Sequence, residues 1–506
     1  MTAAQRRQLF VVAGPLVALA LAAWLPLAEP AAAMAGLAAW MAVWWLSEAV
    51  PLPVTALVPL VAMPATQLAS AKAVGAAYGH PIIFLFLGGF LLALGLEESG
   101  LHRRLSLRVI LWTGDRPRLL VLGFFVCTAL ISMWVNNTAT AMLMLPVALS
   151  VIGPPPAADD LGEAAAGQRR FAAATLLAVA HGASIGGMGT LVGTAPNMVL
   201  VAQMESIFPA APAISFGGWM AFATPFVALM VVASWALLVG PLLRVPARGL
   251  ASGSSNLAEE LAGLGKLRRD EWQAGGLFAL VALGWVFGDD LRLGEDMTIR
   301  GWRSLLDLKG VDDGALAIGG ALLLFVLPSG DRPGKPLLTW DVSARIPWGL
   351  LLLFGGGFAL ADGFGSSGLS LAMAKALVGL QGAAPALVLA VVVVGLCGLT
   401  ELTSNTATAA LSLPVLAQLG VAMELDPRAL MVPATLAASC GFALPVATPP
   451  NAIVYGSGRL TVGEMVRVGL ALDALSVVLI VAFGVLWGGP TLGIDWQALP
   501  GWASPR

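Results

Sequence analysis

The residues best suited to chemistry in this chain are two clusters of asparagine, threonine and serine inside strongly apolar segments. Residues 136–141 read Asn-Asn-Thr-Ala-Thr-Ala, and residues 404–409 read Ser-Asn-Thr-Ala-Thr-Ala. A proline follows each cluster at the same distance, at positions 146 and 414. Amide and hydroxyl oxygens are ligands for hard cations, while the N–H and O–H groups of these side chains can hold an anion. The two clusters are therefore the first candidates for an ion-binding site.

The two clusters belong to an internal duplication. Asn405 follows Asn137 by 268 positions, and the same spacing carries Gly89-Phe90 onto Gly357-Phe358 and residues 99–101 onto residues 367–369. A register kept from position 89 to position 146 indicates two related repeats rather than chance composition. Polar clusters that recur once per repeat in apolar surroundings are typical of transporters whose binding site lies between the repeats.

A second pair of segments also recurs. Residues 186–197 read Gly-Gly-Met-Gly-Thr-Leu-Val-Gly-Thr-Ala-Pro-Asn, and residues 444–451 read Leu-Pro-Val-Ala-Thr-Pro-Pro-Asn. Their final asparagines are 254 positions apart, because the first repeat has an additional loop at 153–170. Glycine and proline runs interrupt a helix, and this frees carbonyl groups for a cation and N–H groups for an anion.

Composition places the chain among polytopic membrane proteins. Hydrophobic residues make up 58% and charged residues 11% of its 506 residues, whereas soluble domains have about 25% charged residues. The net charge of −2 and the lack of a basic stripe predict no nucleic-acid partner. The three cysteines lie in apolar runs without metal-ligand spacing and are expected to be packed as small hydrophobic side chains.

Apolar stretches of about 20 residues predict the membrane spans. We expect eleven spanning helices, at 9–28, 33–48, 52–64, 80–97, 172–206, 216–243, 271–288, 311–328, 345–363, 428–456 and 467–488. Two further apolar segments, 118–151 and 384–420, carry the polar clusters at their middle. Polar turns survive at membrane depth where protein or a water-filled cavity surrounds them, so we interpret both as re-entrant hairpins. The alternative is a pair of short spanning helices in each case.

The predicted fold is an all-α polytopic membrane protein built from two repeats. The boundaries are an N-terminal helix at 1–30, a first repeat at 31–243, a cytoplasmic linker at 244–270, a second repeat at 271–490 and a C-terminal tail at 491–506. The first repeat contains the hairpin 118–151 and the broken helix 172–206, and the second contains the hairpin 384–420 and the broken helix 428–456.

Lysine and arginine placement predicts the orientation in the inner (plasma) membrane. With the N-terminus in the cytoplasm, one side receives the basic residues at 6, 7, 103, 104, 108, 116, 118, 244, 248, 266, 268, 269, 332, 335, 345, 459 and 467. The mixed-charge loop 292–309 is the exception and would face outward. Eleven spans then leave the C-terminus outside, and the two repeats become inverted, an arrangement that suits alternating access.

These motifs resemble the signatures of the divalent anion/sodium symporter family, whose members carry dicarboxylates, citrate or sulfate. The similarity extends from about Trp44 to Leu486 and rests on both polar clusters and both interrupted helices. The resemblance implies a homodimer with a scaffold domain and an elevator-type transport domain that contains the hairpins and broken helices.

The resemblance also implies the site residues. Those expected to bind substrate are Asn136, Asn137, Thr138, Thr194, Ser404, Asn405, Thr406, Thr448 and Pro449. The first sodium site would use the Asn137 side chain and carbonyls of Ser132, Val135 and Gly193. The second would use the Asn405 side chain and carbonyls of Thr400, Thr403, Ala447 and Pro449. The first cluster begins with Asn136 where the family usually has serine, which leaves open which anion fits.

The residues themselves favour sodium symport. A dianion in a low-dielectric site needs compensating charge. Lys, Arg and His are absent from 127–146, from 397–414 and from the two interrupted segments, so bound Na⁺ is expected to supply that charge. The predicted function is sodium-coupled symport of C4-dicarboxylates such as succinate, malate or fumarate. A sulfate or citrate carrier, an anion exchanger and an arsenite-type carrier of related architecture are the alternatives.

Other ionisable residues receive secondary interpretations. His181, near the first interrupted segment, is expected to be a packed helix residue, with proton coupling as its alternative role. Glu401, beside the second cluster, could orient its loop or act as a cation ligand. Residues 101–111 carry arginines on one face and predict an interfacial helix. The chain lacks the H-E-x-x-H and G-x-S-x-G motifs, which argues against an enzyme.

Overall fold

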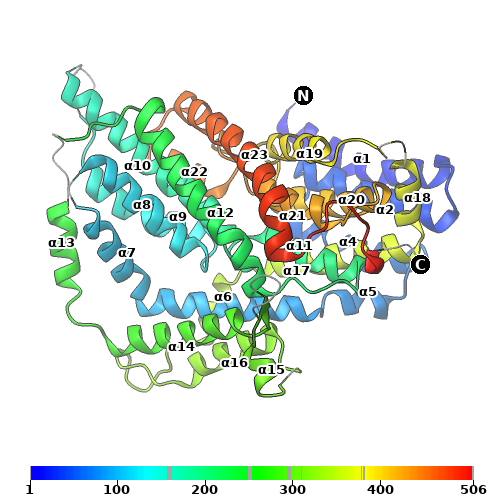
Figure 1. Cartoon of the computed structure of the whole chain (residues 1–506), viewed down its shortest axis with the longest axis horizontal. Coiled ribbons are helices and arrows are strands. Elements are labelled where there is room, and N and C mark those ends of the chain that lie inside the picture. Colours follow the sequence, from blue (N-terminus) through cyan, green and yellow to red (C-terminus); the bar gives the residue numbers. More distant parts are fainter. Residues whose placement is uncertain are drawn as a thin grey trace.

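The computed structural model describes residues 2–503 apart from 115, 157–161, 249–253, 293–297, 309, 378, 380 and 381. These residues form a helical protein (Figure 1). The sheet in the described chain is a pair of two-residue strands, β1 (Leu291–Arg292) and β2 (Thr298–Ile299). The chain begins with α1 (Ala3–Trp24), which packs against the second helix.

The first repeat runs from the second to the twelfth helix. Its elements are α2 (Glu29–Ser47), α3 (Leu52–Thr55), α4 (Val58–Ala65), α5 (Ala71–Ala77), α6 (Pro81–Ser99), α7 (Leu101–Trp112), α8 (Pro117–Ser132), α9 (Asn137–Ile152), α10 (Glu163–Gly187), α11 (Ala195–Ile207) and α12 (Phe216–Leu237), with a terminal π-helical turn η1 (Leu238–Leu242). Helix α13 (Ser254–Gly263) then crosses the expected linker.

The part of the chain expected to be the second repeat follows. Its helices are α14 (Arg269–Val286), α15 (Trp302–Leu305), α16 (Asp313–Val326), α17 (Trp348–Ser366), α18 (Leu369–Leu377), α19 (Pro385–Thr400), α20 (Asn405–Ala422), α21 (Arg428–Ala437), α22 (Pro449–Tyr455) and α23 (Val462–Leu492), together with the 3₁₀ turns η2 (Trp340–Arg345) and η4 (Gly501–Ala503).

Both polar clusters lie where two short helices meet. Helices α8 and α9 pack against each other, and so do α19 and α20. Helices α8, α9 and α19 have 16 residues each, which gives a length of about 24 Å. That length is shorter than the roughly 30 Å hydrocarbon core of a bilayer. Asn136 and Ser404 are the N-cap residues at which the second helix of each pair begins.

The two predicted helix interruptions are present. Helix α10 ends at Gly187 and α11 begins at Ala195, while α21 ends at Ala437 and α22 begins at Pro449. Proline at the first turn restarts each short helix, because its fixed φ suits that position and its missing N–H costs nothing there. The short helices cross between the repeats, since α11 packs on α20 and α22 packs on α9.

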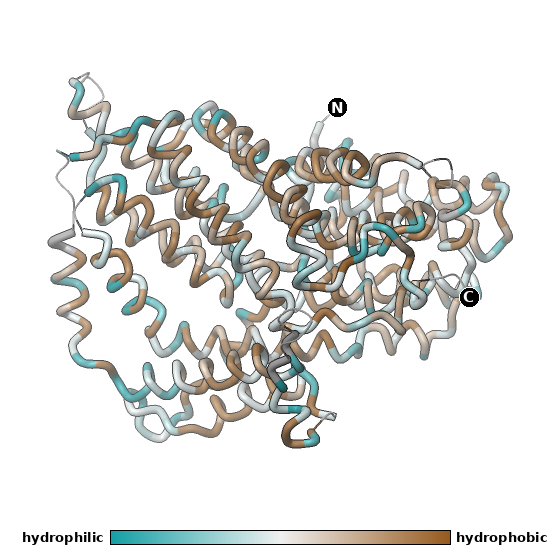
Figure 2. The backbone as a smooth tube through the Cα atoms, viewed as in Figure 1, coloured by the Kyte–Doolittle hydropathy of each residue, from teal (hydrophilic) through white to brown (hydrophobic). Residues whose placement is uncertain are grey.

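The surface of the helices is that of a membrane protein. Within the described residues, six segments are long and apolar enough to span a bilayer, at Ala4–Trp24, Glu29–Ser47, Ala71–Ser99, Phe216–Leu242, Trp348–Ser366 and Val462–Leu492. Figure 2 shows apolar residues along α12 and α23 and hydrophilic residues gathered mainly at helix ends and connections. The predicted helical membrane class is confirmed.

Several predicted boundaries were wrong for local reasons. The first helix covers Ala3–Trp24 rather than 9–28, since the chain becomes extended at Leu25 before a proline. The segment expected as one helix at 52–64 is divided into α3 and α4. The short helices α5, α13, α15 and α18 had no counterpart among the predicted spans because each is too short to give a hydropathy signal. The interfacial helix expected at 101–111 is α7.

Candidate functional site

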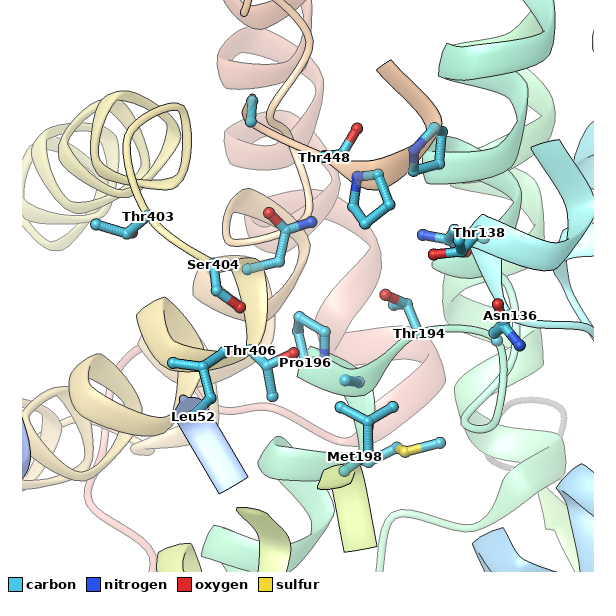
Figure 3. Close-up of a pocket in the computed structure, with 18 of the residues that line it drawn as sticks. Leu52, Asn136, Thr138, Thr194, Pro196, Met198, Thr403, Ser404, Thr406 and Thr448 are labelled. Atoms are coloured by element: carbon cyan, nitrogen blue, oxygen red, sulfur yellow. The ribbon is translucent and has the colours of Figure 1, made fainter. Parts of the chain in front are cut away.

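Both polar clusters and both interrupted segments meet in one pocket of about 530 Å³. Figure 3 shows Asn136 and Thr138 on one side of it and Ser404 and Thr406 on the opposite side, with Thr194 between them. The predicted residues that line the pocket are Asn136, Asn137, Thr138, Gly193, Thr194, Thr403, Ser404, Asn405, Thr406, Ala447, Thr448 and Pro449. Ser132, Val135 and Thr400 are not among its lining residues.

The rest of the wall comes from other helices. Phe90 of α6 and Leu350 of α17 line it, together with Glu48 and Leu52 at the end of α2 and the start of α3. Among the described lining residues, Glu48 is the one that carries a charge, and it is negative. An anion in this pocket therefore finds amides, hydroxyls and helix N-termini rather than a fixed cation.

The Asn137 amide is surrounded by oxygen atoms. As placed, its Oδ1 accepts a hydrogen bond from Ser132 Oγ at 2.8 Å. The same amide end lies 3.1 Å from Ala183 O and 3.3 Å from Gly193 O. With its nitrogen in that position, the amide donates to these oxygens; with its oxygen there, four oxygens converge as they do around a hard cation. Oxygen atoms are the ligand type that Na⁺ prefers, and the amide oxygen joins them in one of its two orientations.

The second cluster repeats this arrangement. Thr400, 268 positions after Ser132, lies with its Oγ1 2.7 Å from Asn405 Oδ1 and 2.8 Å from Ala438 O. In the first cluster Ser132 Oγ likewise lies 2.7 Å from a carbonyl of the interrupted helix. Sequence reasoning assigned only the carbonyls of Ser132 and Thr400 to the sites. It could not find the hydroxyl contacts, because they depend on how the hairpin packs against α10 and α21.

Asn197 and Asn451 fix the two interrupted segments. Asn197 Nδ2 donates to Gly187 O at 3.2 Å and to Thr190 O at 2.7 Å. Asn451 Nδ2 donates to the carbonyls 254 positions later, at 441 (3.2 Å) and 444 (2.9 Å). Both side chains are fully buried, so these bonds replace the helical bonds that each break removes. Both asparagines belong to the interrupted-helix motifs of the sequence, but their bonding could not be predicted from those motifs.

Close approach at the first break requires glycine. A Cβ atom on Gly193 would lie 2.4 Å from Gly187 O, and one on Gly187 would lie 2.5 Å from Asn137 Oδ1. Both distances are below any that real Cβ atoms adopt. The glycines therefore allow the hairpin tip and the interrupted helix to share one set of oxygen atoms.

Nearly the whole chain matches the model of one protein family. The model of the sodium:sulfate symporter transmembrane region matches residues 3–494. The chain belongs to this family. The predicted divalent anion/sodium symporter relationship is thereby confirmed, and the chain is a transporter rather than an enzyme.

Curated relatives agree with this family assignment. The chain is 37% identical over 469 residues to the sodium-dependent dicarboxylate transporter SdcS of Staphylococcus saprophyticus, covering 91% of this chain and 87% of that protein. It is 37% identical to the same transporter from Staphylococcus aureus strain RF122 over 90% of this chain and 86% of that protein.

Two solved structures share the fold at low sequence identity. Neisseria gonorrhoeae MtrF, from a class of antimetabolite efflux pumps, aligns with a TM-score of 0.58 and 14% identity over 84% of this chain and 85% of that chain. The Alcanivorax borkumensis YdaH transporter aligns with a TM-score of 0.54 and 18% identity over 82% of this chain and 86% of that chain.

Within this symporter, Glu401 holds the second interrupted segment. Its Oε1 accepts from Ala443 N and its Oε2 from Leu444 N, both at 2.8 Å. Glu401 was expected to orient the loop of the second cluster, and its carboxylate instead bonds the backbone of the interrupted segment. The equivalent residue of the first repeat is Met133, whose carbonyl accepts from the Thr190 hydroxyl, and that hydroxyl in turn accepts from Gly193 N.

The Asn136 side chain belongs both to the pocket wall and to the start of a helix. It lines the pocket, and its Oδ1 accepts from Ala139 N at 2.9 Å as the N-cap of α9. Ser404, at the equivalent position, lines the pocket but makes no side-chain cap bond. The two helix starts therefore differ in their capping, since the N-cap side chain bonds the backbone in the first and not in the second.

His181 does not line the pocket. It is fully buried in α10, and its Nε2 lies 3.2 Å from Phe442 O in the second repeat. This contact fits the packed residue expected from the sequence.

Proposed function

We propose that this protein is a sodium-coupled symporter of C4-dicarboxylates such as succinate, malate and fumarate. The observation that carries the proposal is the pocket shared by the two repeats, where each of two asparagine amides meets a hydroxyl that also contacts a carbonyl of an interrupted helix. Relatives 37% identical to the chain are named sodium-dependent dicarboxylate transporters, which supports this choice over sulfate, citrate or arsenite-type transport.

Electrostatics supports symport over exchange. Moving a dianion out of water is costly unless cations accompany it. The described pocket lining offers no Lys, Arg or His, so the co-transported Na⁺ ions supply the compensating charge in this proposal. The first ion would bind Asn137 and carbonyls of Ser132, Val135 and Gly193, and the second Asn405 and carbonyls of Thr400, Thr403, Ala447 and Pro449.

The substrate would lie between the two hairpin tips. Its carboxylates would meet the amide and hydroxyl groups of residues 136–138 and 404–406. Thr194 and Thr448, at the N-termini of α11 and α22, would add donors from the interrupted helices, and Pro449 would close that side. The helix N-termini provide further favourable potential for a dianion.

An elevator motion would carry this site across the membrane. In the proposed architecture eleven helices span the bilayer, with the N-terminus inside and the C-terminus outside, and the scaffold forms the homodimer contact. Arg7 of α1 donates to Ala49 O, next to Glu48 of the pocket wall.

Uptake into vesicles tests the proposal. Purified protein reconstituted into proteoliposomes should accumulate radiolabelled succinate only with an inward Na⁺ gradient, and a membrane potential should change the rate. Unlabelled malate, citrate and sulfate would rank the competing anions. Equal succinate uptake in sodium-free buffer without a proton gradient would contradict the proposal, and competition by sulfate alone would favour the sulfate carrier.

A further inference from the structure

A second pocket of about 300 Å³ lies away from the transport site. It is formed where the chain enters α8 and α10 and where it leaves η1. Four arginines line it, and Glu163 is the one acidic residue among its described lining residues; the arginines are Arg118, Arg170, Arg244 and Arg248. Neither the family nor the relatives named above assign a role to this arginine pocket.

Charge in the arginine pocket is poorly balanced. Glu163 accepts from Arg170 at 3.2 Å, but its side chain is 94% exposed, so water screens this ion pair. In the described part of the chain, no carboxylate lies within ion-pair distance of Arg118, Arg244 or Arg248. Arginines of the neighbouring helix behave differently, since Arg103 and Arg104 are each paired with a glutamate.

The backbone around the arginine pocket is held in place. Arg118 Nε donates to Val245 O at 2.8 Å, and Trp235 Nε1 donates to Arg118 O at 2.8 Å. Arg244 has a φ of 50°, a left-handed conformation that costs energy for a residue with a side chain. Arg170 Nε is buried and has no partner in the described chain. The cluster is therefore built, with donor capacity left for a ligand.

The arginine pocket lies next to an apolar helix surface. Helix α12 is long and apolar enough to span a membrane. Its Leu229 and Val232 side chains are 42% and 52% exposed. Trp235 follows them one turn later and ends this surface with its indole N–H bonded to the start of α8. Tryptophan at such a boundary marks the headgroup level of a bilayer. A molecule in the arginine pocket would thus lie at the level of lipid headgroups.

We propose that the arginine pocket binds the phosphate headgroup of an anionic phospholipid, whose acyl chains lie along the exposed apolar side of α12. Guanidinium groups match the geometry of phosphate oxygens and keep their charge at every physiological pH. Basic pockets between helices on the cytoplasmic side recur as anionic-lipid sites. Inorganic phosphate shares the headgroup chemistry, but it would make no use of Leu229 and Val232.

Native mass spectrometry of the full-length protein tests the lipid assignment. Delipidated protein is titrated with phosphatidylglycerol and, separately, with phosphatidylcholine. We expect selective retention of phosphatidylglycerol, about fivefold weaker in Arg248→Gln and about twenty-fivefold weaker in Arg244→Gln/Arg248→Gln, because each basic residue contributes about a factor of five. The control is Arg108→Gln, which removes an exposed arginine of α7 outside the pocket and should leave retention unchanged.

Three outcomes would overturn the proposal. Equal retention of both lipids would remove the anionic specificity, and equal losses in Arg108→Gln and Arg248→Gln would show a general surface-charge effect. Displacement of phosphatidylglycerol by inorganic phosphate, but not by chloride at the same ionic strength, would assign the pocket to free phosphate. If the double variant does not fold, Arg248→Gln alone decides, since Arg248 is exposed and donates no hydrogen bond within the described protein.

Discussion

The two half-sites of the pocket share one hydrogen-bonded framework but differ in how their interrupted segments are held. In both, a hydroxyl lies between an asparagine amide and a helix carbonyl, and a second asparagine bonds the broken segment. The second segment is also bonded by the Glu401 carboxylate, whereas the first is bonded through Thr190 and the carbonyl of Met133. We infer that the shared hydroxyl and amide contacts determine which ions the pocket binds. The contacts that differ would set the stability of each interrupted segment separately.

The largest effect is expected where the halves are most alike. Asn137→Ala and Asn405→Ala should each abolish sodium-dependent succinate uptake, because each removes the amide at the centre of one oxygen cluster. A lost interaction with a charged ligand costs about 1.5–3 kcal/mol, or roughly ten- to a hundredfold in affinity.

Uptake assays on purified, reconstituted variants measure these losses. Ser412→Ala in α20 is a matched control, since its hydroxyl only donates to Thr408 O and lies outside the pocket. Normal uptake with unchanged sodium dependence in both asparagine variants would refute the shared framework.

The asparagines of the interrupted segments should come next. Asn197→Asp and Asn451→Asp keep the shape but replace buried donors with oxygens that face carbonyls. We expect each to lower the free energy of unfolding by about 1–3 kcal/mol or more, and to reduce uptake through misplaced segments. Thermal unfolding in detergent measures the first effect. A stable protein with normal uptake from either variant would show that its segment keeps its shape without the amide.

Glu401→Gln should separate the two halves. Glutamine has one acceptor oxygen, so either Ala443 N or Leu444 N loses its partner, at a cost of about 1–3 kcal/mol. Sodium titration of thermal stability should show weaker binding in Glu401→Gln, while Met133→Leu, at the equivalent position, should change it by less than a factor of two or so. If both variants weaken sodium binding equally, the difference between the halves has no functional meaning.

The smallest effect concerns the residues at 136 and 404. Asn136→Ser should leave stability nearly unchanged, because serine is also a good N-cap, but it should alter the ranking of succinate, malate, citrate and sulfate. The reciprocal change, Ser404→Asn, makes both tips alike and should also alter the ranking of these four anions. Competition assays at fixed sodium measure both. An unchanged ranking in Asn136→Ser would mean that Asn136 serves its helix and not the substrate.

Much of the architecture could be predicted from the sequence, because proline and glycine residues mark the ends of its helices. The first hairpin, expected at 118–151, covers Pro117–Ile152, since proline begins it and a glycine follows it. Both helix interruptions were predicted for the same reason. The carbonyls of Ala183 and Ala438 were not, because a backbone oxygen has no sequence signature. The contact of Ser132 and Thr400 with them depends on the packing angle of α8 and α19, which composition does not determine.

One feature of the helix packing bears on how long the protein spends in each state. Helix α11 packs on α17, where Gln203 donates to Gly357 O and Ser206 donates to Asp362, while Ala452 of α22 and Phe90 of α6 both line the pocket. In the proposed cycle, α22 and α6 would close on each other when α11 and α17 separate. The positions equivalent to Ser206 and Asp362 are Leu460 and Leu94, which cannot form that bond. The state described here would therefore keep a side-chain bond that the opposite state lacks, and bound sodium and substrate would have to offset that bond.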